Sequence, residues 1–207
     1  MAYGDFSLAA VLDSFELVDR YDSLFPTLQP IEPSTWLLET LNLGRSLALP
    51  GGSEKARSEF LIAPLLLELE RQYGDQLAIY SGRNFEVDRD RGLTGECDFI
   101  LGKGKTALLV RSPIFCLVEA KRDDVEAGIG QCAAQMVGAE VFNRSQGESL
   151  PQIFGCVTTG EVWQFLRLHQ QQLTVDRDRY YLNPLNLVLG CLHHIIATQL
   201  QESTPSA

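Results

Sequence analysis

One apolar run ends in two charges, and it constrains the fold more than any other stretch of the chain. Residues 114–118 are apolar without interruption, and Glu119, Ala120 and Lys121 follow them directly. A run this apolar predicts a central strand that is covered on both faces. In an extended chain Glu119 and Lys121 share a face, roughly 6 to 7 Å apart. Burying two charges is costly unless they pair or bind a metal ion, so this strand end is the first candidate functional site.

A second carboxylate stands on an apolar strand shortly before this run. In residues 95–101 alternate positions form one apolar face, and Asp98 shares the other face with Ile100. The following segment, 102–110, is rich in turn residues and short enough for an antiparallel connection. We therefore expect Asp98 and Glu119 to come together on neighbouring strands.

Asp98, followed by Glu119-Ala120-Lys121 at the end of the next strand, resembles the motif of the PD-(D/E)XK, or restriction-endonuclease-like, nuclease superfamily. The order of the expected elements resembles that superfamily as well. These elements are a helix, three strands, a helix and a strand, at residues 53–73, 77–87, 96–101, 114–120, 126–143 and 152–158. The resemblance implies an α/β fold with an αβββαβ core, in which helices flank a central mixed sheet.

Five short segments resemble a group of uncharacterised cyanobacterial proteins of this fold. They are EKARSE at 54–59, GECDFI at 95–100, EAK at 119–121, GQC at 130–132 and VTTG at 157–160. This likeness extends over most of the chain and names no substrate.

Two carboxylates that converge on one point suit Mg²⁺ or Mn²⁺, because these hard cations prefer oxygen ligands. The resemblance implies that Asp98, Glu119 and the carbonyl group of Ala120 bind the metal ion. It also implies that Lys121 assists the attacking water in the hydrolysis of a phosphodiester bond. Three roles remain open for Lys121: orienting the water, deprotonating it, or stabilising the transition state.

The helix expected at 53–73 begins after Ser53, a suitable N-cap, and Pro64 should kink it. Its apolar stripe includes Glu59, which shares a face with Ala56, Phe60, Ala63, Leu66 and Leu67. A salt bridge at the core edge would explain this carboxylate. In related nucleases a Glu of the first core helix joins the metal site, and Glu59 matches it.

The helix expected at 126–143 carries Gln131 and Gln135 one turn apart, on a face shared with Gly128 and Gly138. The glycines allow close approach to the sheet, and the glutamines could simply bond a neighbouring backbone. Related nucleases place a Gln of this helix beside the active site, and Gln131 matches it. One exonuclease branch has an aromatic residue four positions later, where this chain has Gln135.

Lys103 and Lys105 lie in the turn between the two strands and are candidate phosphate contacts. The sequence Gly104-Lys105-Thr106 matches the end of a phosphate-binding loop. The first glycine of that motif is missing, because Phe99 stands there, and the next residues predict a strand instead of a helix.

The 207 residues suit one domain, with an N-terminal extension at 1–50, a nuclease-like core at 53–158, and a hairpin with a closing helix at 161–207. No apolar run reaches membrane-spanning length and no signal-like segment begins the chain, so we expect a cytoplasmic protein. The closing helix carries His193 and His194, which point about 100° apart and are not expected to bind one metal ion.

Five cysteines, an odd number, are widely spaced in apolar elements. They predict buried thiols, with neither a disulfide framework nor a zinc site. They are Cys97, Cys116, Cys132, Cys156 and Cys191.

The net charge of −10 conflicts with nucleic-acid binding, which usually needs cations to neutralise phosphates. Local clustering of basic residues, a metal ion or a partner could resolve the conflict. We expect a metal-dependent nuclease whose partner is nucleic acid, in the first place DNA, with a homodimer or a partner subunit left open. The alternatives are a catalytically silent binding or scaffold module and a protein in which Glu119 and Lys121 form a plain ion pair.

Overall fold

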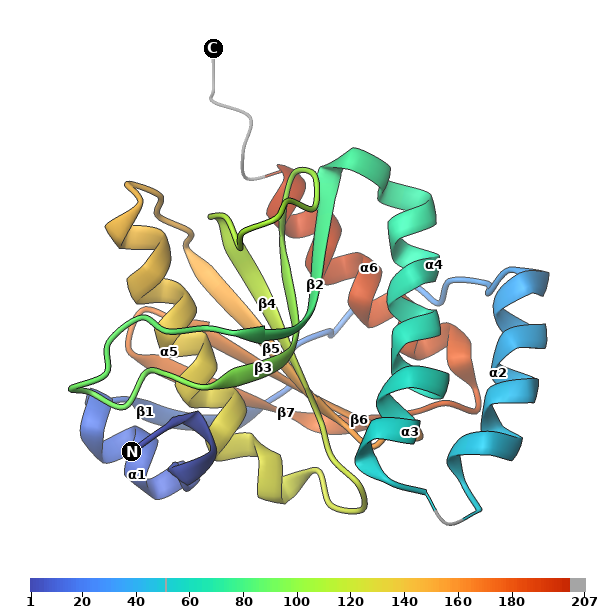
Figure 1. Ribbon diagram of the computed structural model, residues 1–207, viewed down its shortest axis with the longest axis horizontal. Coiled ribbons are helices and arrows are strands. Elements are labelled where there is room, and N and C mark those ends of the chain that lie inside the picture. Colours follow the sequence, from blue (N-terminus) through green and yellow to red (C-terminus); the bar gives the residue numbers. More distant parts are fainter. Residues whose placement is uncertain (51, 202–207) are drawn as a thin grey trace.

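The computed structural model describes residues 1–50 and 52–201, which form an α/β structure around one mixed sheet (Figure 1). The sheet has seven strands in the order β1-β7-β6-β5-β4-β3-β2. The strands are β1 (Val18–Asp22), β2 (Leu77–Asn84), β3 (Glu96–Lys103), β4 (Ile114–Ala120), β5 (Gln152–Thr158), β6 (Val162–His169) and β7 (Gln172–Tyr181).

Helices cover both faces of this sheet (Figure 1). The α-helices are α1 (Leu8–Phe15), α2 (Thr35–Ala48), α3 (Glu54–Arg57), α4 (Ala63–Tyr73), α5 (Ile129–Ser145) and α6 (Leu185–Gln201). A π-helical turn, η2 (Ser58–Ile62), joins α3 to α4, and short 3₁₀ turns are η1 (Tyr3–Asp5), η3 (Gly74–Gln76) and η4 (Glu126–Gly128). Residues of α2, α4 and α6 form the apolar cluster on one face, and residues of α1 and α5 form the cluster on the other.

The expected α/β class, with a mixed sheet flanked by helices, is confirmed. The helical segment, β2, β3, β4, α5 and β5 follow one another in the expected order. All residues of β4 are buried, and the strand pairs antiparallel with β3 and parallel with β5. β4 therefore lies inside the sheet, as its apolar sequence predicts.

The region before the core and the last strand of the sheet are where the sequence was least informative. Strand β1 lies in the N-terminal extension, begins at Val18, and all of its residues are exposed. Strand β7 forms a hairpin with β6 within the 161–207 region, but its own bounds were not predicted, because charged residues interrupt it at 176–179. Both strands were obscured because the apolar alternation that identifies half-buried strands is weak in them.

A π-helical turn, η2, lies directly before the helix α4 that contains Pro64. The N–H of Ala63 donates to the carbonyl of Ser58, five residues earlier. Pro64 has no N–H for the carbonyl of Phe60, four residues before it. Gly44 of α2 packs against that carbonyl, and a Cβ at this glycine would collide with it. The packing of α2 on η2 thus involves Gly44 in α2 and Pro64 in α4, just after η2.

The same turn changes which residues face the core. The buried side chains are Leu61, Ile62, Leu65, Leu66 and Leu69, whereas Phe60 and Leu67 are largely exposed. The side chain of Glu59 is 54% exposed and lies 3.7 Å from Lys55. Placing Glu59 on the buried stripe was therefore wrong, because a π turn shifts the phase of the helix.

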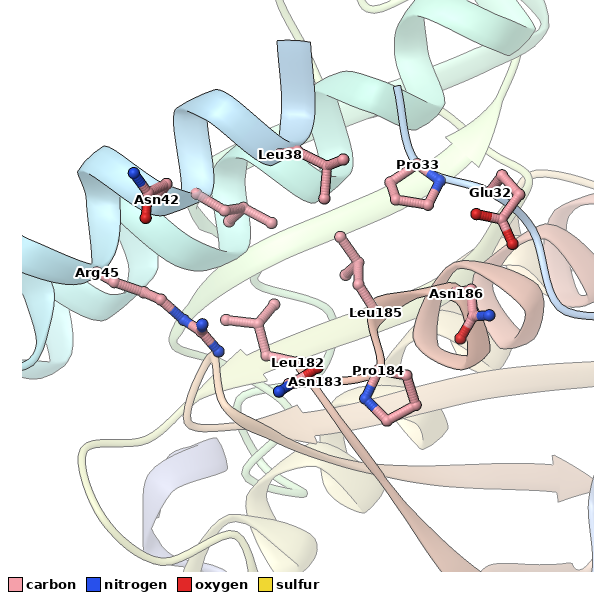
Figure 2. Close-up of a pocket in the computed structure, with 11 residues that line it drawn as sticks. Glu32, Pro33, Leu38, Asn42, Arg45, Leu182, Asn183, Pro184, Leu185 and Asn186 are labelled. Atoms are coloured by element: carbon pink, nitrogen blue, oxygen red, sulfur yellow. The ribbon is translucent and has the colours of Figure 1, made fainter. Parts of the chain in front are cut away.

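A groove opens between α2 and residues 182–186, where β7 leads into α6 (Figure 2). The proline-rich segment before α2 is attached to the start of α6, since Ile31 N–H donates to the carbonyl of Asn186 at 3.0 Å. Within the described part of the chain, no helix is long and apolar enough to cross a membrane.

Replacing Gly44 by alanine tests the packing of α2 on the π turn. Alanine normally stabilises a helix interior by about 1 kcal/mol relative to glycine. Here the added Cβ meets the Phe60 carbonyl, so we expect Gly44→Ala to lower the free energy of unfolding by roughly 1–3 kcal/mol. Chemical denaturation measures the change, with Leu43→Ala, at a side chain that is 68% exposed, as the control. A stabilised Gly44→Ala protein would contradict the packing described here.

Candidate active site

The ends of β3 and β4 bring together the two carboxylates that the sequence singled out. The antiparallel register pairs Phe99 with Val118. Continued by one residue, it sets Asp98 opposite Glu119, just beyond the last pair of the ladder. The two strands form here because both are apolar up to this point, so the carboxylates mark the end of the hydrophobic sheet interior.

Glu119 is almost completely buried, at 2% exposed, and both of its carboxylate oxygens are bonded. Lys121 Nζ donates to Oε1 at 2.6 Å, and Gln135 Nε2 of α5 donates to Oε2 at 2.8 Å. Burial and, to a smaller extent, the nearby Asp98 charge together raise the pKa of Glu119 to about 7, against the opposing effects of Lys121 and Gln135. Glu119 is therefore poised between its charged and neutral forms near neutral pH.

Lys121 turns towards the site instead of towards solvent, and its side chain is only 19% exposed. Besides Glu119, its ammonium donates to Gln131 Oε1 at 3.1 Å. A Cβ at Gly128 would crowd the side chains of Lys121 and Val157, so this glycine makes room for the lysine stem. Burial acts to lower the pKa of Lys121, but the carboxylates around it outweigh burial and raise the pKa. The lysine is accordingly charged.

Asp98 is held by the backbone of β4. Its Oδ2 accepts a hydrogen bond from the N–H of Ala120 at 2.8 Å. Burial raises the pKa of Asp98 above its usual value, and the charges of Glu54 and Glu96 add to the increase. The Ala120 N–H and Lys121 act in the opposite direction.

Asp98 also borders an open cavity of about 280 Å³ between α3, the π turn and strands β2 and β3. Its charged lining consists of Glu54, Lys55, Glu59, Glu96 and Asp98. Glu59 thus shares a cavity with Asp98, whereas Glu119, Lys121 and Gln131 meet on the side of α5. Glu54 and Glu96 were not recognised from the sequence, although Glu96 and Asp98, two residues apart on a strand, follow the spacing of a shared face.

Lys103 and Lys105 do not lie beside the carboxylates. Lys103 ends β3 and Asp98 stands near its start, so about 16 Å of extended chain separates them. Lys105 lies 3.3 Å from Asp75, near the start of β2. Phosphate contacts from these lysines to a substrate at Asp98 would have to span that distance.

The histidines and cysteines take no part in the site. His193 Nδ1 lies 2.8 Å from the hydroxyl of Tyr73, and the ring of His194 packs against Phe25. All five cysteines are buried free thiols, as expected. Among the described residues, no group of three or more His, Cys, Asp or Glu side chains could hold a metal ion.

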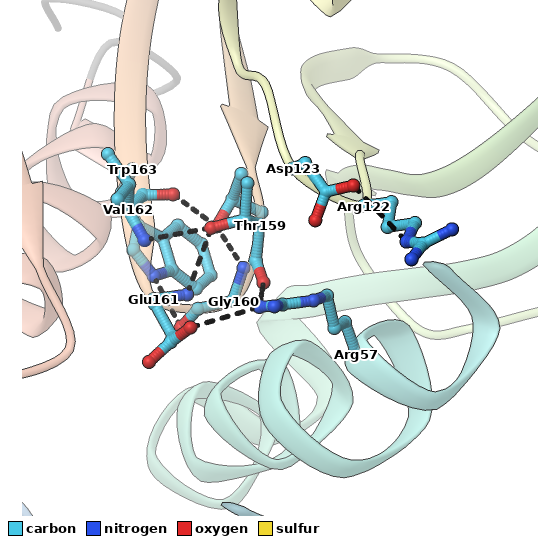
Figure 3. A network of polar contacts seen from close by, with 9 residues as sticks. Arg57, Arg122, Asp123, Thr159, Gly160, Glu161, Val162 and Trp163 are labelled. Atoms are coloured by element: carbon cyan, nitrogen blue, oxygen red, sulfur yellow. Dashed lines mark hydrogen bonds and ion pairs between the residues drawn. The ribbon is translucent and has the colours of Figure 1, made fainter. Parts of the chain in front are cut away.

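A polar network fixes α3 to the turn between β5 and β6, next to the segment that follows Lys121 (Figure 3). Arg57 Nη1 donates to the carbonyl of Thr159 at 3.0 Å and to Glu161 Oε2 at 3.1 Å. The hydroxyl of Thr159 in turn accepts the N–H of Val162 at 3.2 Å. The network holds the helix that carries Glu54 and Glu59 in place over the sheet end.

The residues at this sheet end fit a hard divalent cation. Mg²⁺ is commonly bound by one or two carboxylates, with water and substrate phosphate completing its shell. Asp98 and Glu119 supply two carboxylates, and burial makes the charged form of each costly, since the pKa of each is raised despite the opposing effect of Lys121. A cation at this point would lower that electrostatic cost.

The buried Glu119 should make the protein less stable as the pH rises. The folded state holds the proton up to a pKa of about 7, whereas the unfolded chain releases it near 4.5. Stability from this group is therefore greatest below pH 4.5 and is lost as the pH rises from 4.5 to 7. We expect a decrease in the free energy of unfolding on the order of 1–3 kcal/mol between pH 5 and 8 in EDTA.

Glu119→Gln should remove this part of the pH dependence, and Glu148→Gln, at an exposed position, should retain it. Urea denaturation at several pH values measures both. The interpretation is wrong if Glu119→Gln and the wild type show the same pH profile.

Comparison of the sequence with protein-family models and with curated proteins gave no match. The function of the chain has to be inferred from the residues that meet at the ends of β3 and β4.

Proposed function

We propose that the chain is a metal-dependent nuclease that hydrolyses phosphodiester bonds, in the first place those of DNA. The observation that carries the proposal is the meeting of Asp98, Glu119 and Lys121 at one end of a buried sheet. A buried carboxylate with a pKa near 7, beside a second carboxylate and a lysine, is typical of a catalytic site. The order of the elements around this site supports a restriction-endonuclease-like fold.

In this proposal Asp98, Glu119 and the Ala120 carbonyl group hold Mg²⁺ or Mn²⁺. The ion supplies polarisation of the phosphate and activation of a water molecule. Gln135 keeps one oxygen of Glu119 in place, and the backbone N–H of Ala120 does the same for Asp98. Both carboxylates are thereby fixed before substrate arrives, which is the preorganisation that catalysis requires.

Lys121 acts as an electrostatic group in this proposal. Its pKa is raised, so it holds its proton at neutral pH and cannot accept another from water. A charged ammonium can donate hydrogen bonds to a phosphate oxygen and stabilise the negative charge of the transition state. Gln131 orients it by accepting one of its hydrogen bonds. Of the roles left open by the sequence, this state disfavours deprotonation of the water and is compatible with orienting it or with stabilising the transition state.

Cleavage of supercoiled, linear and single-stranded DNA, with RNA in parallel, tests the proposal in Mg²⁺, in Mn²⁺ and in EDTA. We expect metal-dependent cleavage, and a loss of at least about 100-fold in Lys121→Ala. Asp98→Asn should lose activity as strongly, while its amide oxygen still accepts the N–H of Ala120 and preserves folding. Lys105→Ala, at the far end of β3, should retain activity. Equal cleavage by wild type and Lys121→Ala would point to a contaminating enzyme and end the proposal.

The metal site has a separate test that does not depend on cleavage. Added Mg²⁺ or Mn²⁺ should raise the melting temperature of the wild type by mass action. The double variant Asp98→Asn, Glu119→Gln should lose that response. If it responds as the wild type does, the ion binds elsewhere and Glu119 with Lys121 forms a plain ion pair.

The acidic cavity beside Asp98 favours one alternative, a catalytically silent binding or scaffold module. Three glutamates and Asp98 face this cavity with Lys55 as its lining cation, a poor surface for phosphates. Such a module would act in a larger restriction or repair assembly, as a homodimer or with a partner subunit. The cleavage assay separates the two: no nicking of naked DNA by the folded protein in Mg²⁺ or Mn²⁺ supports the module.

A further inference from the structure

The groove between α2 and residues 182–186 lies apart from the acidic sheet end and has a volume of about 460 Å³. Volumes of this size are common for small-molecule sites. Four leucines form its apolar wall: Leu38 and Leu41 from α2, and Leu182 and Leu185 from the opposite side. Polar side chains stand at its two ends (Figure 2).

Arg45 occupies one end of the groove, and its side chain extends from α2 towards Asn183 (Figure 2). Among the described residues, no ion pair or hydrogen bond engages its guanidinium, although the side chain is partly buried. The amides of Asn42 and Asn183 border the groove and are likewise free of hydrogen bonds within the described chain. A partly buried guanidinium without a carboxylate partner favours an anion, which it can bind through two parallel hydrogen bonds.

Asn186 and Glu32 stand at the other end (Figure 2). The side-chain oxygen of Asn186 is buried and has no hydrogen-bond partner in the described structure. Buried acceptors are normally paired, and this oxygen can accept an N–H or O–H donor from the groove once the Asn186 side chain turns outward. The carboxylate of Glu32 beside it also accepts hydrogen bonds only, which gives this end the opposite preference to that of Arg45.

The walls of the groove are fixed without a ligand. Gly44 locks α2 onto the carbonyl of Phe60, and a Cβ at Gly190 of α6 would collide with the carbonyl of Gln29. The hydrogen bond from the Ile31 N–H to the Asn186 carbonyl attaches the segment before α2 to the start of α6. A preformed groove spares a ligand the cost of ordering its own site.

We propose that this groove binds a small organic anion: a carboxylate or phosphate group at Arg45, an apolar body along the leucines, and an N–H or O–H donor at Asn186 and Glu32. The arrangement of one cation, one uncompensated acceptor end and an apolar floor is complementary to such a molecule. This site is independent of the nuclease proposal, because none of its residues lines the cavity at Asp98.

Isothermal titration calorimetry with the full chain tests the site. Three probes carry an anion at one end and a donor at the other: 6-aminohexanoate, 4-hydroxyphenylacetate and thymidine 5′-monophosphate. Acetate and inorganic phosphate serve as controls, because they carry the anionic group without the apolar body and the distal donor. We expect at least one of the three probes to bind with a Kd below about 1 mM and more tightly than either simple anion. The carboxylate and phosphate probes show which anion Arg45 accepts.

Two variants locate the binding. Arg45→Met should raise the Kd of the probe by about tenfold or more. Arg111→Met, at an exposed arginine outside the groove, should leave the Kd unchanged. Asn186→Leu should also weaken the bound probe. Its melting temperature without ligand should stay the same or rise, because the unpartnered oxygen is removed.

Three results would overturn the proposal. They are no binding of any of the three probes, binding no tighter than that of inorganic phosphate or acetate, and binding that survives Arg45→Met. A lower melting temperature in Asn186→Leu, with binding intact, would assign Asn186 a purely structural role and equally overturn it.

Discussion

The burial of Glu119 at the end of β4 is the constraint on which the rest of the sheet end depends. A charged carboxylate at 2% exposure is stable only with partners, and two elements supply them. Lys121 directly follows β4, and Gln135 comes from the buried face of α5. Both α5 and the chain after β4 must therefore approach closely, which small residues such as Gly128 permit. The burial of the Glu119 carboxylate thus constrains how α5, β4 and the loop after β4 pack together.

Sequence patterns predicted this part of the structure because hydrophobic burial and pairing act there together. The uninterrupted apolar run located β4, and the alternation before it located β3 with Asp98. Their antiparallel connection followed from the short turn-rich segment, and the register then places Asp98 opposite Glu119. These conclusions needed only local periodicity and chain connectivity, which is why they could be made without coordinates.

Features that depend on distant contacts could not be predicted in the same way. The burial of Glu59 was predicted wrongly because of the π turn. This turn lies where Gly44 packs against the Phe60 carbonyl, 16 residues away in sequence. Helical periodicity carries no information on that contact. The partner of Glu119 on α5 was equally hidden: the sequence matched Gln131 to the active site and gave Gln135 no role there, whereas Gln131 contacts Lys121 and Gln135 contacts Glu119.

The charge of Lys121 follows from the carboxylates around it. Glu119, Glu54 and Asp98 each raise its pKa against the effect of burial. Lys121 in turn lowers the pKa of Glu119 and of Asp98, so the lysine and the carboxylates stabilise one another's charged forms, whereas the charge of Asp98 disfavours the charged form of Glu119. A cation that neutralised Glu119 would also remove the largest contribution that keeps Lys121 protonated. Binding of a cation at the carboxylates and protonation of Lys121 are therefore coupled. A change in one changes the other.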